Sequence, residues 1–136
     1  MAKNYKIFIS HSWAHSSDLQ GLQKLLNSRG YFNVEFTEAS KDVPINSTNA
    51  TYIKSRLRTK IQSSDVVLAL AGIYASHSDW MPWELDTAKT LDVPIIGVIP
   101  SAQERISQEV YSRSVVDVRW NTESIVEAIR THAKQV

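Results

Sequence analysis

The chain has 136 residues, a formal net charge of +1 and no cysteine. This length suits one domain spanning residues 1–136, and the charge predicts no bulk attraction to nucleic acid or to an anionic membrane. Without cysteine, disulfides, thiolate nucleophiles and Cys-type zinc sites are excluded, and without a signal peptide or an apolar run of ~18 residues a cytoplasmic protein is expected.

Short apolar segments rich in β-branched residues alternate along the chain with helical patterns. YKIFIS opens the series as a buried strand, and DVVLALA is the most strand-like run, which places it at the centre of a sheet. The predicted strands cover residues 5–10, 33–36, 65–71, 95–99 and 116–119.

The segments between these strands show apolar residues at helical spacing. The predicted helices cover residues 18–28, 51–62, 82–91 and 121–133, with a short helix expected in the loop after residue 100. Pro82 suits a first helical turn, and Asn121 or Thr122 is expected to cap the last helix. The basic cluster KSRLRTK, residues 54–60, falls in a helical pattern and is read as a solvated helix face.

This alternation predicts an α/β fold, a five-stranded parallel sheet with helices on both faces. The strand count suits the flavodoxin-like order 2-1-3-4-5. Ligands of such sheets bind at the carboxyl ends of the strands, here between strands one and three. The segments SHSWAH (10–15) and AGIYASHSDW (71–80) meet there, and the long polar loop 37–49 emerges on the same edge.

Polar residues at this edge are the first site candidates. Ser10 either donates to a phosphate or ribose or bonds local backbone, with neither reading favoured. His11 is an acid–base candidate, although a packed loop histidine is the commoner case. The four histidines lack metal-ligand spacing, so no metal site is expected. The chain has no glycine-rich phosphate loop and no G-x-S-x-G elbow, and it lacks the acidic residues of a response-regulator receiver.

Four stretches together resemble the TIR-like proteins of the Thoeris anti-phage defence system. They are YKIFISHSW, SSDVVLALAGIYASHSDWMPWELDTA, VPIIGVIP and RWNTESIVEAIRTHA, and they cover nearly the whole chain in order. The stretch SDWMPWEL matches the family motif of serine, tryptophan, three residues and glutamate, which here are Ser78, Trp80 and Glu84. Many TIR enzymes carry cysteine after this tryptophan, whereas Met81 and Pro82 stand here.

The resemblance implies an enzyme of the NAD+ glycohydrolase or ADP-ribosyl cyclase type, with NAD+ as substrate and no cofactor. It implies cleavage of the nicotinamide–ribose bond and an ADP-ribose-derived nucleotide signal that activates a separate effector protein. Self-association is also a family property. The rival interpretation is a non-catalytic TIR-like interaction module, and a third is a small nucleotide-binding flavodoxin relative.

In the enzyme interpretation Glu84 is catalytic, because a carboxylate stabilises the ribosyl cation left when nicotinamide departs. Trp80, four residues earlier, shares its helix face and walls the site, whereas Trp83 is expected in the core. Without the resemblance, Glu84 is better read as a first-turn helix glutamate favoured by the dipole. Weaker candidates for substrate contact are Trp13, Tyr74 and Asp42.

Overall fold

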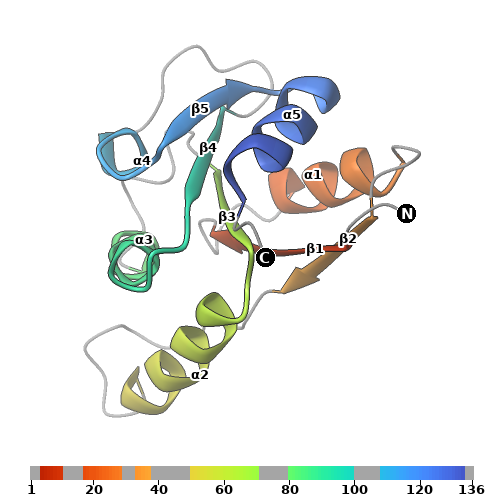
Figure 1. Cartoon of the computed structure of the whole chain (residues 1–136). Helices are drawn as coiled ribbons and strands as arrows, with labels where there is room; N and C mark the ends of the chain where they lie inside the picture. The colour runs from red at the N-terminus through yellow and green to blue at the C-terminus, as the bar shows by residue number, and fades with distance from the viewer. Residues whose placement is uncertain are drawn as a thin grey trace.

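The computed structural model describes residues 4–10, 17–28, 33–37, 50–70, 80–99 and 108–133, and these form an α/β fold with a parallel sheet, as predicted (Figure 1). The strands are β1 (Asn4–Ser10), β2 (Asn33–Thr37), β3 (Val66–Leu70), β4 (Ile95–Ile99) and β5 (Val116–Arg119). The helices are α1 (Ser17–Asn27), α2 (Ala50–Gln62), α3 (Trp80–Thr90), α4 (Gln108–Tyr111) and α5 (Thr122–His132).

The sheet has the strand order β2-β1-β3-β4-β5, and every neighbouring pair is parallel. Because β1 lies between β2 and β3, the chain reverses its direction of winding there, which creates a topological switch point. Ser10 is the last residue of β1 and pairs in register with Ala69 of β3. The carboxyl end of β1 is therefore at the edge where sheets of this type bind ligands.

Alternating side chains of the strands build two apolar layers, one on each face of the sheet. Helices α1 and α5 cover one face, and α2, α3 and α4 cover the other (Figure 1). On β1, Ile7 and Ile9 point into the α1–α5 layer, whereas Phe8 points into the α2–α3 layer. Since successive side chains alternate, Ser10 shares the face of Phe8, and its hydroxyl points toward α3.

The helix ends show where local chemistry sets the boundaries. Asn121 is the cap of α5, and its side chain accepts a hydrogen bond from the Ser124 backbone N–H. Helix α3 begins at Trp80, two residues before the predicted start, and Pro82 still lies in its first turn, where a missing N–H costs nothing. Asp92 follows α3 with a φ of 58°, a left-handed conformation that ends the helix without glycine.

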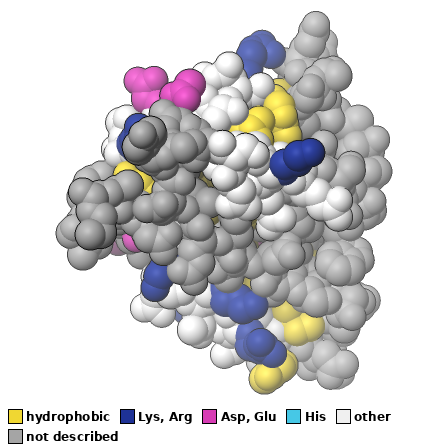
Figure 2. All heavy atoms as spheres, turned by 90° about the vertical axis from the view of Figure 1, so that its right-hand side faces the viewer, with side chains coloured by type: hydrophobic (Ala, Val, Ile, Leu, Met, Phe, Trp, Pro, Cys, Tyr) yellow, Lys and Arg dark blue, Asp and Glu magenta, His cyan; other side chains and the backbone are white. Residues whose placement is uncertain are grey.

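Helix α2 is the most basic element that the structure describes. Its residues 54–60 carry two lysines and two arginines, and residues 50–64 contain no aspartate or glutamate. Figure 2 shows several Lys and Arg side chains low on the molecule, at the height that α2 has in Figure 1, and others nearer the top, where the prominent acidic side chains also lie. In the part of the chain that the structure describes, no helix is long and apolar enough to cross a membrane.

Candidate functional site

One buried hydrogen bond joins two of the predicted site residues. The Ser10 hydroxyl donates to Glu84 Oε1 at 2.9 Å, and both residues are fully buried, with 0% of their surface exposed. The second carboxylate oxygen, Oε2, is buried as well. A hydroxyl that donates to a carboxylate favours the charged form of the acid, which opposes the cost of burying that charge.

The sheet register explains why there is room for a carboxylate above Ser10. Ser10 pairs with Ala69, Ala69 with Gly97, and Gly97 with Asp117, so these four residues form one row across the sheet. In a parallel sheet, paired residues point to the same face. The row has a polar residue at each end and small residues between them, on the face that α3 covers.

The position of Glu84 in its helix corrects the prediction that this glutamate lies in the first helical turn. Because α3 begins at Trp80 and not at residue 82, Glu84 is its fifth residue, and the first turn contains no acidic residue. The helix dipole acts mainly within the first turn, so it stabilises a carboxylate at position 84 only weakly. A buried carboxylate also departs from the pattern of a solvent-exposed capping residue.

Two tryptophans stand beside this carboxylate in the order expected from helical geometry. Trp80 lies one turn before Glu84 and is 6% exposed, so its indole is buried on the same side of the helix as the carboxylate. Trp83 is half-buried against the same core layer, and its ring meets Trp80 edge-on at 5.8 Å between centroids. Outside Trp83, the Lys54 ammonium of α2 lies 5.9 Å from the centre of the indole ring.

At the other end of the row, a second carboxylate fills the space that a side chain on residue 97 would need. A Cβ on Gly97 would collide with Asp117 Oδ1 and approach Val110 Cγ1. The Ser114 hydroxyl donates to Asp117 Oδ1 at 2.6 Å. Burial raises the pKa of the Asp117 carboxyl above its ordinary value, and the hydrogen bond from Ser114 opposes this rise.

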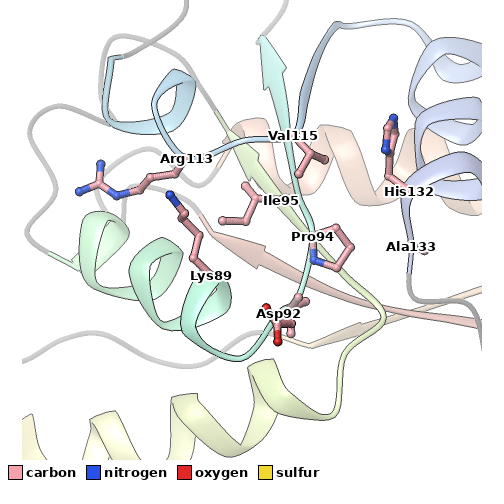
Figure 3. A pocket seen from close by; sticks show the side chains of 9 residues that line it. Lys89, Asp92, Pro94, Ile95, Arg113, Val115, His132 and Ala133 are labelled. Carbon is pink, nitrogen blue, oxygen red and sulfur yellow. The ribbon is translucent and has the colours of Figure 1, made fainter.

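A cavity of about 500 Å³ lies at the opposite end of the sheet (Figure 3). Pro94, Ile95 and Val115 come from the amino ends of β4 and β5 and form its apolar wall, and the Lys89 and His132 side chains stand on either side. Arg113 also lines this cavity, and its guanidinium points outward to a 2.7 Å ion pair with Asp86. None of the residues that line this cavity belongs to the predicted site.

Five of the predicted contact residues fall outside the residues that the structure describes. They are His11, Trp13, Asp42, Tyr74 and Ser78. Of the predicted site residues, Ser10, Trp80 and Glu84 are therefore the ones whose arrangement is known, and they lie together. Among the described residues, no three His, Cys, Asp or Glu side chains are grouped as a metal ion requires.

Lys54 and Asp117 were not predicted as residues near this row. Lys54 directly follows Ile53, which belongs to the apolar stripe of α2, so helical spacing already places it at the edge of the buried face. Asp117 interrupts the apolar run VVDVRW, and an acidic residue inside a strand is an unusual feature that singles it out.

Several solved structures share the fold of this chain, although their sequences differ widely from it. The chain is similar to a 2-deoxyribosyltransferase from Bacillus psychrosaccharolyticus, with a TM-score of 0.62, 16% identity, and coverage of 88% of this chain and 89% of that one. It is also similar to a CMP N-glycosidase, BcmB, from Clostridium botulinum, with a TM-score of 0.54, 13% identity, and coverage of 92% and 98%. At these identities the likeness establishes the fold alone.

Comparison with known families is more specific. A search of curated proteins finds no match. The model of the Thoeris protein ThsB, TIR-like domain, matches residues 8–105. This match spans most of the chain and includes Ser10, Trp80 and Glu84, so the chain belongs to the family of TIR-like domains of Thoeris protein ThsB.

Proposed function

We propose that the chain cleaves the bond between nicotinamide and ribose in NAD+, with Glu84 as the catalytic carboxylate. The observation that carries this proposal is the buried Ser10–Glu84 pair at the carboxyl edge of the sheet. A charged group is costly to bury, so a glutamate without a chemical role is not expected at a fully buried position. Membership in the ThsB family gives independent support.

The chemistry needs one acidic group. When the C1′–N1 bond breaks, its electron pair leaves with the nicotinamide, whose pyridinium nitrogen becomes neutral. No proton has to be supplied to this leaving group. The ribosyl centre becomes an oxocarbenium-like cation, which a nearby carboxylate stabilises until a nucleophile adds to C1′ and loses its proton.

Trp80 and Ser10 assist Glu84 in this proposal. The buried Trp80 indole excludes water from one side of the carboxylate, which strengthens its electrostatic effect on the cation. The Ser10 hydroxyl donates to Oε1 and so fixes the orientation of the carboxylate toward the ribosyl centre. Because both carboxylate oxygens are buried, substrate reaches Glu84 only after the contacts that cover it have moved.

Two of the structural relatives have names that fit this class of reaction. One is called a 2-deoxyribosyltransferase and another an N-glycosidase. Both names describe chemistry at a sugar–base bond. The parallel supports a reaction at this type of bond on this fold, and it does not identify the glycosyl acceptor.

The proposal extends to an ADP-ribose-derived nucleotide as the signal and to a separate effector protein as its receiver. The acceptor decides the product. Water would give ADP-ribose, and a hydroxyl or ring nitrogen would give a cyclised or conjugated nucleotide. Self-association that opens and completes the site would explain how a buried glutamate becomes accessible.

The test is incubation of the protein with NAD+, in the resting state and after infection of cells that produce it. Chromatography with mass spectrometry then follows nicotinamide and the nucleotide product. We expect product from the parent protein, and none above background from Glu84→Gln. A parent protein that drives defence in cells yet releases no nicotinamide in either state would favour a non-catalytic interaction module.

A further inference from the structure

The proposed substrate contains a negatively charged diphosphate, which must bind close to the negatively charged Glu84. A diphosphate bound near Glu84 needs positive groups, because the carboxylate itself repels it. Many nucleotide sites meet this need with a glycine-rich loop, and this sequence has none of the usual patterns. A cation from a neighbouring element near the carboxyl edge would meet this need.

Lys54 is the described cation that the fold brings toward this edge on the same side as Glu84. Strand β2 ends at the carboxyl edge, and α2 runs back from there, so its first turns lie closest to the edge. The Lys54 ammonium lies over Trp83, and Trp83 meets Trp80 edge-on. The two contacts place the ammonium at most about 12 Å from the centre of the Trp80 ring.

Helical geometry sets the order of these groups across the face of α3. Positions 83, 80 and 84 follow one another around the helix, so Trp80 lies between Trp83 and Glu84. Lys54 and Glu84 therefore stand on the two sides of a wall made of two indoles. This separation is useful, because a lysine in direct contact with Glu84 would neutralise the carboxylate that the reaction needs.

We propose that Lys54 binds the diphosphate of the nicotinamide dinucleotide while its ribosyl centre lies at Glu84. This inference rests on the proposed function and adds a specificity-determining residue to it. The substrate then spans the tryptophan wall, with the cationic end near the carboxylate and the anionic middle near the lysine. Substrates without phosphate gain nothing from Lys54.

The geometry distinguishes Lys54 from Arg56 and Lys60, two other cations of α2. The side chain of Lys54 is half-buried and held over an indole ring, so less rotamer freedom is lost on binding. Arg56 lies 5.8 Å from the ring of Tyr52, which is 67% exposed, and this pair faces solvent. Lys60 lies six residues further along the helix, roughly 9 Å away, which is about one Debye length in physiological salt.

The experiment measures binding without turnover. Isothermal titration calorimetry is carried out on Glu84→Gln protein, alone and combined with Lys54→Met, Lys54→Arg or Lys60→Met. Each protein is titrated with NAD+ and with nicotinamide riboside, which has the same ribosyl bond and no phosphate. Methionine keeps the unbranched stem on Trp83 and removes only the charge.

We expect Lys54→Met to weaken NAD+ binding roughly tenfold at physiological ionic strength, the loss typical of one hydrogen bond to a charged group. Lys54→Arg and Lys60→Met should bind NAD+ within about twofold of the Glu84→Gln protein, because they keep the charge at position 54. Riboside binding should be the same in all four proteins. Raising the salt should shrink the effect of Lys54→Met.

Equal NAD+ affinity with and without Lys54→Met would overturn the inference and leave the proposed function standing. An equal loss for NAD+ and for the riboside would also overturn it, because the side chain would then act through packing on Trp83. If none of the four proteins bound NAD+ after self-association had opened the site, the proposed function itself would fail, and the inference with it.

Discussion

The Ser10 hydroxyl donates a 2.9 Å hydrogen bond to Glu84 Oε1 inside the protein, and the two residues lie 74 positions apart in the sequence. This bond ties the carboxyl end of β1 to the second turn of α3. It fixes the orientation of the carboxylate, and it supplies a donor that the buried charge needs. This one contact is therefore expected to affect both the stability of the fold and the proposed activity. Substitutions can measure the two effects separately.

Ser10→Ala removes the donor and leaves a buried carboxylate oxygen without it. A buried group that loses its partner costs about 1–3 kcal/mol, so the free energy of unfolding should fall by this amount. The rate of nicotinamide release should also fall, because the carboxylate is no longer held in place. Denaturant unfolding and a nicotinamide assay measure the two effects.

The matched control is Ser64→Ala. Ser64 is buried too, and its hydroxyl donates to the backbone carbonyl of Lys60 at 2.8 Å. It lies in the short connection between α2 and β3, so it belongs to the opposite end of the sheet. Its loss should cost about 0.5–1.5 kcal/mol of stability and leave turnover unchanged. Equal effects of both variants on turnover would mean that Ser10 acts only through folding.

Gly97→Ala should destabilise the protein, because the new methyl group would collide with Asp117 Oδ1 and press on Val110. Overpacking of this kind costs roughly 1–3 kcal/mol. Thermal unfolding of Gly97→Ala, Asp117→Ala and the double variant measures the coupling between the two positions. The double variant should be more stable than the sum of the single effects predicts. Strict additivity would show that the carboxylate moves aside at no cost.

Asp117→Asn should change the dependence of stability on pH. Burial raises the pKa of Asp117 in the folded protein, so the folded state holds this proton more tightly than the unfolded chain. Stability from this group is therefore present at low pH and is lost as the pH rises through the folded pKa. Asparagine keeps an acceptor for Ser114 and cannot ionise.

Melting temperatures across acidic to neutral pH measure this effect. At neutral pH Asp117→Asn should melt at or above the temperature of the parent, and the difference should shrink as the pH falls below the ordinary value for aspartate. A difference that grows toward low pH would mean that the charged form is the one that the fold stabilises.

The sheet was predictable because each strand has its own local signal. The run DVVLALA predicted the fully buried β3, and the order of strands and helices predicted parallel pairing with helices on both faces. The start of α3 was wrong by two residues, because Pro82 marks a first turn without saying which of its positions it takes. That small error moved Glu84 into the first turn and gave the dipole interpretation more weight than the structure supports.

The depth of the site was not predictable from the sequence. A pattern of residue types places Ser10 and Glu84 at one edge, and it does not say that both become fully buried and bonded to each other. Contacts between α2 and α3 depend on how two helices pack on one face of the sheet, so the sequence alone does not place Lys54 over Trp83. The same holds for the collision that only Gly97 avoids.

The most direct test of the central claim is the rate of nicotinamide release by Glu84→Gln, measured with its melting temperature on assembled protein whose parent form shows turnover. Glu127→Gln, the same substitution at an exposed position of α5, is the control. We predict that Glu84→Gln loses roughly a hundredfold to a thousandfold in rate, as expected for one well-placed electrostatic group. Its melting temperature should be unchanged or higher, because glutamine keeps an acceptor for Ser10 and removes a buried charge. A Glu84→Gln rate equal to that of Glu127→Gln and the parent would contradict the account, and would leave Glu84 as a structural residue.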